Sequence, residues 1–138
     1  MSEQSERLRA GIEEFNRTGR IPTDLYAPEF ELHQASSIVD TAGVFHGPDA
    51  PQASLDELSE SFEDMTFEPE RILEAPGGEV VVLIHAFGRG RASGLELDNH
   101  IAWVWTFRDG KATRLVVYEE QGDALEAVGL SSSDASVP

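Results

Sequence analysis

Hydrophobic and polar residues alternate most regularly between Leu95 and Glu119. Before the turn at Asp109-Gly110, one parity carries the large apolar side chains: Leu95, Leu97, Ile101, Trp103, Trp105 and Phe107. This period of two is typical of a strand with two unlike faces. Asp-Gly supplies the positive φ angles of a two-residue hairpin turn, and Ala112 to Tyr118 continues in residues that favour strands. The stretch therefore predicts a hairpin of two long strands.

A helical period appears in three other places. Near the N-terminus, Ser2 can cap a helix that Gly19 ends, with one apolar stripe. A second, longer helix is predicted after Gly47, with prolines in its first turn. Asp123 to Val128 can form a short last helix. The stripe of the first helix is Leu8, Ile12 and Phe15, and the second helix would place Pro51, Leu55, Leu58, Phe62 and Met65 on one face.

The segments before the second helix are shorter. Ile21 to Ala27, bounded by prolines, is consistent with a turn or two of helix. Phe30 to Gln34 alternates like a short strand. Ser36 to Gly43 is small and polar and is expected to be a loop. Val44 to His46 is expected to form a brief strand.

Two strands are predicted ahead of the hairpin. Pro69 lies within Thr66 to Ala75 and would restrict a strand there to a sheet edge or a bulge. Pro76-Gly77-Gly78 marks a turn. Glu79 to Arg89 is apolar on both parities for much of its length, so both of its faces should be covered by protein.

This order of elements predicts an α+β fold, in which a curved, largely antiparallel sheet wraps around N-terminal helices and encloses a conical pocket. At 138 residues the chain is expected to form a single domain over residues 1–130, with 131–138 as a flexible tail. Because the strand from Glu79 is apolar on its outer face too, we expect that face to meet a second copy of the chain.

The composition narrows the function. With 10 basic and 26 acidic residues, the formal charge is −16, which argues against binding to nucleic acid or to anionic membranes. The absence of cysteine excludes thiolate chemistry and disulfides. No apolar run approaches a membrane span and the N-terminus lacks a signal peptide core. The expected location is the cytoplasm.

Several short stretches resemble the SnoaL-like family of the NTF2-like superfamily, which shares the cone of ketosteroid isomerase. They are Phe15-Asn16, Leu25 to Phe30, Phe45-His46-Gly47, Phe62-Glu63-Asp64, Val104 to Lys111 and Ala124 to Leu130. The resemblance implies the fold but no single activity, because the superfamily includes isomerases, cyclases, hydrolases and binding modules. At the positions that match the isomerase's general base, oxyanion-hole tyrosine and protonated aspartate, this chain has residues at or near Gln34, Gly11 and Trp103. Steroid-type isomerisation by that mechanism is therefore not expected.

Other residues remain as candidates for chemistry in the pocket. If the face of Trp103 is concave, Glu119 is the best candidate for a buried carboxylate with a raised pKa, which suits general acid or base catalysis. His46, between a strand and a helix, is its candidate partner. The alternatives are a solvated strand end for Glu119 and a hydrogen-bonded structural role for His46. The expected ligand-binding residues are Tyr26, His33, Gln34, Asn99, Ile101, Trp103 and Val117.

No metal site or cofactor is predicted. The four histidines lack a local ligand spacing, and Asp98-Asn99-His100 lies on a strand whose faces alternate, which we expect to prevent a compact ligand set. His85 and His100 are assigned to the outer face, at the expected interface between subunits. The glycine-rich GRGRASG segment lacks the context of a phosphate loop.

Two hypotheses follow from the sequence. The first is an enzyme that acts on a hydrophobic small molecule, such as a polyketide or terpenoid, by acid-base chemistry of the isomerase, cyclase or hydrolase type. The second is a non-catalytic binding or accessory module with the same pocket. Two facing titratable groups within one apolar cavity would distinguish the enzyme from the binding module.

Overall fold

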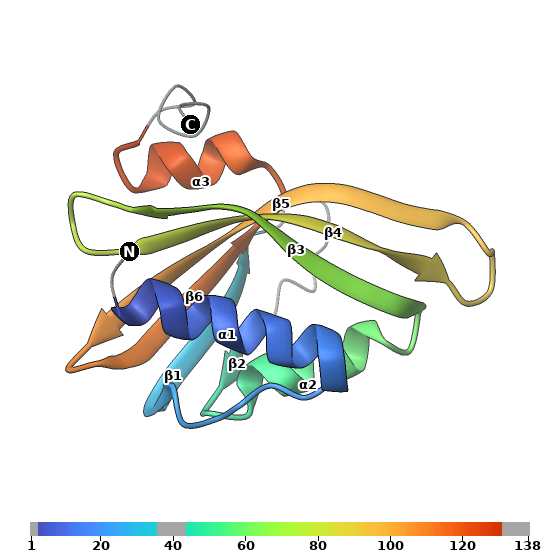
Figure 1. Ribbon diagram of the computed structural model, residues 1–138, viewed down its shortest axis with the longest axis horizontal. Coiled ribbons are helices and arrows are strands. Elements are labelled where there is room, and N and C mark those ends of the chain that lie inside the picture. The colour runs from blue at the N-terminus through green and yellow to red at the C-terminus, as the bar shows by residue number, and fades with distance from the viewer. Residues whose placement is uncertain (1–2, 36–43, 131–138) are drawn as a thin grey trace.

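The computed structural model describes residues 3–35 and 44–130, without the side chains of Gln34 and Ala35 (Figure 1). Three helices and six strands follow one another along these described residues. In order they are α1 (Glu3–Thr18), β1 (Tyr26–Ala35), β2 (Val44–His46), α2 (Ala50–Leu58), β3 (Phe62–Glu74), β4 (Val80–Gly90), β5 (Glu96–Arg108), β6 (Lys111–Tyr118) and α3 (Gln121–Ala127). The expectations for a loop over 36–43 and a tail over 131–138 lie outside the described residues.

The six strands form one mixed sheet in the order β2-β1-β6-β5-β4-β3. β1 and β6 are parallel, and the other neighbours are antiparallel. The predicted hairpin is confirmed as β5 and β6. Asp109 and Gly110 have φ values of 51° and 79°, as a tight turn between two twisted strands requires. The α+β class predicted from the sequence is confirmed.

The sheet has two covered faces. Helices α1 and α2 lie on one side, which we call the inner face, and α3 lies on the opposite, outer face (Figure 1). The larger core fills the inner side and includes Leu8, Ile12 and Phe30. A smaller core lies between α3 and the outer side of β4 and β5, and it includes Val81 and Leu125. No helix among the described residues is long and apolar enough to cross a membrane.

Helix α1 is held against the inner side by its predicted stripe and by polar contacts, among them those of Asn16. Leu8 and Ile12 are buried. Near the end of the helix, Asn16 Nδ2 donates to the carbonyl oxygen of Phe67 at 2.7 Å, and Asn16 Oδ1 accepts from the Phe67 amide at 3.0 Å. Because β3 is an edge strand, these bonds satisfy backbone groups that no neighbouring strand pairs. The contact fixes α1 over the sheet.

Two helical predictions are wrong. The second helix ends at Leu58, and both Phe62 and Met65 belong to β3. Phe62 pairs with Gly90 of β4, so tertiary pairing prevails over the helical period of the apolar residues. Residues 21–27 form no helix either. β1 begins at Tyr26, next to Leu25, whose carbonyl oxygen accepts from the Ala112 amide at 2.8 Å.

The prediction for Pro69 is confirmed in both of its parts. β3 is an edge strand, and its register against β4 shifts between Pro69 and Arg71. The expectation that the outer face of β4 meets a second copy of the chain stays a prediction, although part of that face is covered within the chain. Val81 and Leu83 are indeed buried, but the side chains that cover them include those of α3 in the same chain. These two residues therefore need no second subunit to cover them.

Candidate functional site

A cavity of about 460 Å³ lies between the helices α1 and α2 and the inner face of the sheet. Gly11 and Phe15 line it from α1, and Leu55 from α2. From the hairpin, Trp103 and Val117 contribute to the opposite wall. Period-two alternation explains that wall, because Ile101, Trp103 and Trp105 share one parity of β5 and Leu115 and Val117 share one parity of β6.

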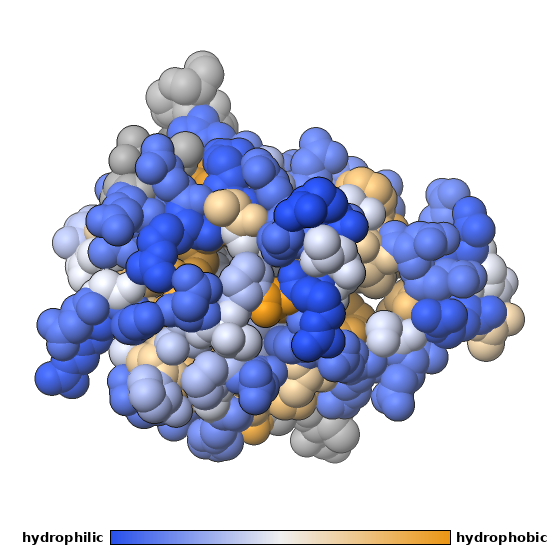
Figure 2. All heavy atoms as spheres, turned by 60° about the horizontal axis from the view of Figure 1, so that its bottom comes forward, coloured by the Kyte–Doolittle hydropathy of each residue, from blue (hydrophilic) through white to orange (hydrophobic). Residues whose placement is uncertain are grey.

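Aromatic rings make much of the wall rigid. The ring centroids of Trp103 and Phe67 are 5.1 Å apart, and those of Tyr26 and Trp105 are 5.8 Å apart. Tyr26 also packs edge-on against Phe30 at 4.8 Å. Such tilted ring pairs add stability beyond the burial of apolar area. Figure 2 shows the side of the molecule at the bottom of Figure 1, which is mostly hydrophilic with hydrophobic atoms in recesses between polar ones.

Of the four titratable residues that line the cavity, only Tyr26 is buried, with 8% of its surface exposed. Burial raises the pKa of Tyr26 well above its ordinary value of 10.0, and the charge of Asp24 raises it further. The phenol therefore stays protonated near neutral pH and can donate a hydrogen bond. Among the described residues, no hydrogen bond is formed by its hydroxyl.

The other three titratable residues are less enclosed. Arg7 Nη1 donates to the carbonyl oxygen of Gly110 at 2.9 Å in an exposed contact. Glu14 forms an ion pair with Arg17, and Asp24 is exposed. These charges are satisfied by solvent or by neighbours at the rim of the cavity, so the buried wall is apolar except for the Tyr26 hydroxyl, the indole N–H of Trp105 and the backbone.

The structure brings together four of the predicted ligand-binding residues. Tyr26, Ile101, Trp103 and Val117 all line the cavity. His33 and Asn99 are not among its lining residues. His33 lies on the parity of β1 opposite Leu32, where its Nε2 is 2.9 Å from Glu31 Oε1. Asn99 is exposed, and the prediction for the Gln34 side chain lies outside the described residues.

The expected pairing of Glu119 with His46 in the cavity is wrong, since neither residue lines it. β6 ends at Tyr118, so the alternation of Leu115 and Val117 does not extend to Glu119, whose side chain is exposed rather than buried. His46 lies on the edge strand β2 with 69% of its side chain exposed, and its Nδ1 is 3.8 Å from Glu31 Oε2.

Two of the three positions taken from the isomerase resemblance lie at the cavity, and the side chain of the third, Gln34, is outside the described residues. Gly11 and Trp103 both line the cavity. Neither offers a carboxyl or a hydroxyl group, so the two oxyanion-stabilising groups of the isomerase pattern are missing from the cavity wall. A Cβ atom added at Gly11 would meet no atom within 4 Å, which shows that this glycine leaves space between α1 and the sheet.

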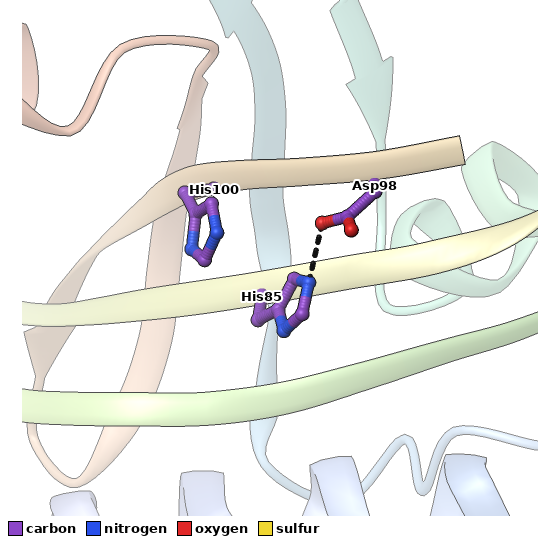
Figure 3. Close-up of side chains that lie close together, drawn as sticks. All are labelled: His85, Asp98 and His100. Carbon is purple, nitrogen blue, oxygen red and sulfur yellow. Dashed lines mark hydrogen bonds and ion pairs between the residues drawn. The ribbon is translucent and has the colours of Figure 1, made fainter. Parts of the chain in front are cut away.

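Sequence reasoning missed a second cluster, on the outer face. His85 of β4 lies beside Asp98 and His100 of β5, and one potential ligand atom from each lies within 4.8 Å of the others (Figure 3). Alternation of the faces was expected to prevent a compact set of metal ligands in Asp98-Asn99-His100. That expectation is wrong, because Asp98 and His100 are two residues apart and share one face. The spacing of Asp98 and His100 in the sequence could have predicted that both side chains lie on one face of the strand. The contribution of His85 depends on strand register, which pairs it with His100.

Solved structures with this architecture place the chain in a fold class. An NTF2-like protein of unknown function from Burkholderia pseudomallei has a TM-score of 0.72 and 20% identity, covering 93% of this chain and 98% of that one. TerC, co-crystallised with polyporic acid, has a TM-score of 0.70 and 20% identity, covering 92% and 98%. The chain therefore has the NTF2-like cone fold.

A narrower assignment comes from the sequence family. The SnoaL-like domain matches residues 9–115, so the chain belongs to the SnoaL-like family, as the resemblance in its sequence predicted. A putative SnoaL-like polyketide cyclase from Jannaschia sp. is similar in structure, with a TM-score of 0.67 and 17% identity over 100% of this chain and 98% of that one. No curated protein matches the sequence.

Proposed function

We propose that this protein binds a largely apolar small molecule in the cavity between α1, α2 and the hairpin, with the Tyr26 hydroxyl donating a hydrogen bond to an oxygen of the ligand. The observation that carries the proposal is the cavity itself: about 460 Å³, apolar walls and one buried phenol. Its volume falls within the range of about 300–1,000 Å³ that is usual for small-molecule sites.

The apolar wall sets the class of ligand. Burial of apolar surface contributes roughly 25 cal/mol for each Å² removed from water, so a flat ring system held between Trp103 and the side chains of α1 gains most of its binding energy in this way. A charged ligand would lose hydration without a buried partner of opposite charge, since the charged residues of the lining lie at exposed or half-exposed positions.

The Tyr26 hydroxyl orients the bound ligand. Because burial holds its pKa high, the phenol is a donor and not a base near neutral pH. A hydrogen bond between neutral groups contributes about 0.5–1.5 kcal/mol, which corresponds to roughly a 2- to 12-fold gain in affinity. A ligand with a carbonyl or hydroxyl oxygen should therefore bind more tightly than the hydrocarbon of the same shape.

Binding is favoured over turnover by the same geometry. Acid-base catalysis needs two titratable groups that face the reacting atoms. The described lining offers one buried phenol and no imidazole, and its two carboxylates, Glu14 and Asp24, lie at half-exposed and exposed positions. Similar structures include both a putative SnoaL-like polyketide cyclase and TerC with polyporic acid, so ligand binding is the property that this proposal takes from the fold.

The test uses two ligands that differ by one oxygen. Fluorenone and fluorene share a tricyclic skeleton, and only fluorenone has a carbonyl. Both tryptophans of the chain line the cavity, so quenching of tryptophan fluorescence reports binding directly, with calorimetry as a check. We expect fluorenone to bind more tightly than fluorene, and Tyr26→Phe to abolish that difference.

The matched control is Tyr118→Phe, which removes the only other phenol, packed against the outer core. It should leave the preference for fluorenone unchanged. The proposal is refuted if the wild type binds neither compound, or if Tyr26→Phe and Tyr118→Phe behave alike while both variants keep the far-ultraviolet circular dichroism of the wild type.

A further inference from the structure

The cluster of His85, Asp98 and His100, which we call the outer-face site, lies away from the cavity, on the opposite face of the sheet. His85 Nε2 and Asp98 Oδ1 are 2.6 Å apart. The imidazole rings of His85 and His100 are stacked, with centroids 4.4 Å apart and planes 12° apart. Two imidazoles and one carboxylate are thus gathered on two adjacent strands (Figure 3).

Strand pairing holds the three residues in place. His85 and His100 are directly opposite each other in the antiparallel register of β4 and β5, and Asp98 pairs with Phe87 two positions along. At the site, β4 pairs with β3 along one edge and with β5 along the other, whereas Asp98 and His100 of β5 pair with β4 alone. Cross-strand partners have Cβ atoms about 4.5–5.5 Å apart, which lets their side chains reach a common ion.

The surroundings of the outer-face site favour a cation. A shallow groove beside it is lined by Asp64, Glu68 and Glu96 together with Asp98, against one basic residue, Arg89. The whole chain carries a formal charge of −16. Negative potential of this kind concentrates cations near the surface and speeds their association.

Glu70 adds an outer contact of the kind that metal-binding histidines use. Its carboxylate oxygens lie 3.0 and 3.1 Å from His100 Nδ1, so that nitrogen donates to Glu70 and Nε2 is left to bind an ion. Gln121 Nε2 in turn donates to Glu70 Oε1 at 2.9 Å. Carboxylates placed in this way set the tautomer and orientation of the ring and make it a better ligand.

We propose that His85, Asp98 and His100 form a binding site for a divalent transition metal, with Zn²⁺ as the ion that best suits two imidazoles and a carboxylate. A metal lies in the plane of each imidazole that binds it, so the stacked rings must tilt about χ2 when the ion enters. His85 is partly exposed and His100 is exposed, which leaves room for this tilt. Water would complete the tetrahedral coordination, as in open zinc sites.

The test is a calorimetric titration of the untagged, chelator-treated chain with Zn²⁺ at pH 7.5. We expect one site per chain. Replacing an outer contact of a metal ligand costs about 10- to 100-fold in affinity, so losing two ligands in His85→Ala/His100→Ala should cost at least about 100-fold. Asp98→Asn, which keeps the side-chain shape, and Glu70→Gln should each weaken binding by about tenfold or more.

The chain offers a matched control, because its four histidines fall into two pairs. His33 and His46 also lie beside a carboxylate, Glu31, but the described structure does not gather these three as a ligand set. His33→Ala/His46→Ala removes the same number of imidazoles. It should leave the affinity for Zn²⁺ within about twofold of the wild type, because neither residue belongs to the outer-face site.

A spectroscopic titration separates a defined site from loose binding at the surface. Co²⁺ in a tetrahedral site absorbs strongly in the visible range, and this absorption should appear in the wild type and in His33→Ala/His46→Ala but not in His85→Ala/His100→Ala. The proposal would be overturned if His33→Ala/His46→Ala and His85→Ala/His100→Ala lost affinity for Zn²⁺ to the same extent. It would also be overturned if a folded His85→Ala/His100→Ala variant bound Zn²⁺ as tightly as the wild type.

Discussion

Gly11 provides a direct test of the cavity, because it is a helical glycine with open space in front of it. It lies in the middle of α1 and lines the cavity, and an added Cβ would contact nothing within 4 Å. In the interior of a helix, alanine is more favourable than glycine by about 1 kcal/mol. Since nothing obstructs the new methyl group, Gly11→Ala should stabilise the fold by about that amount.

The stability gain can be measured by thermal and urea unfolding. For a chain of this size, 1 kcal/mol corresponds to a rise in Tm of roughly 3–5 °C. Gly11→Leu keeps a good helix former but fills part of the cavity. If the leucine displaces the ligand from about 60 Å² of apolar wall, the loss is about 1.5 kcal/mol, or roughly tenfold in affinity for fluorenone.

Gly122→Ala is the matched control. Gly122 lies in α3, on the other side of the sheet, and an added Cβ would also meet nothing within 4 Å. The Gly122→Ala variant should gain no more stability than Gly11→Ala does, and its affinity for fluorenone should be unchanged. A lower Tm for Gly11→Ala, or unchanged fluorenone affinity in a folded Gly11→Leu variant, would show that the space beside Gly11 is not as described.

Two further predictions concern polar contacts. Asn16→Ala leaves the backbone amide and carbonyl of Phe67 without their side-chain partner. We expect it to lower the free energy of unfolding, measured in urea, by about 1–2 kcal/mol. The control is Asn99→Ala, at an exposed strand position, which should change the free energy of unfolding by less than about 0.5 kcal/mol. The hydrogen bond with His33 lowers the pKa of Glu31 below its ordinary 4.5. This contact therefore stabilises the fold above that value, and the contribution is lost as the pH falls through the lowered pKa. His33→Ala should raise the pKa of Glu31 in a carboxyl NMR titration, and an unchanged value would contradict the assignment.

The sequence by itself determined the elements whose signals are local. The hairpin of β5 and β6 follows from alternation on both sides of Asp109-Gly110, because side-chain parity and turn geometry depend only on neighbouring residues. The burial of β4 on both faces follows from an apolar run. Pro69 indicated an edge strand because proline cannot donate a ladder hydrogen bond. The family resemblance added the cone fold and placed Gly11 and Trp103 at the cavity.

Only the tertiary structure decided which side chains meet. Phe62 continues the helical period of α2, yet it lies in β3 because pairing with β4 outweighs a weak local preference. Glu119 shares the parity of Val117, but the strand ends before it and the side chain reaches solvent.

The outer-face site shows the same limit most clearly. The spacing of Asp98 and His100 is present in the sequence, whereas His85, 13 residues before Asp98, joins them only through the register of two strands. Register is set by the packing of whole strands against helices and neighbours, and a shift of one residue would turn every side chain to the other face. The residues of a strand can therefore be predicted from the chain, but the partners across the sheet come from the fold.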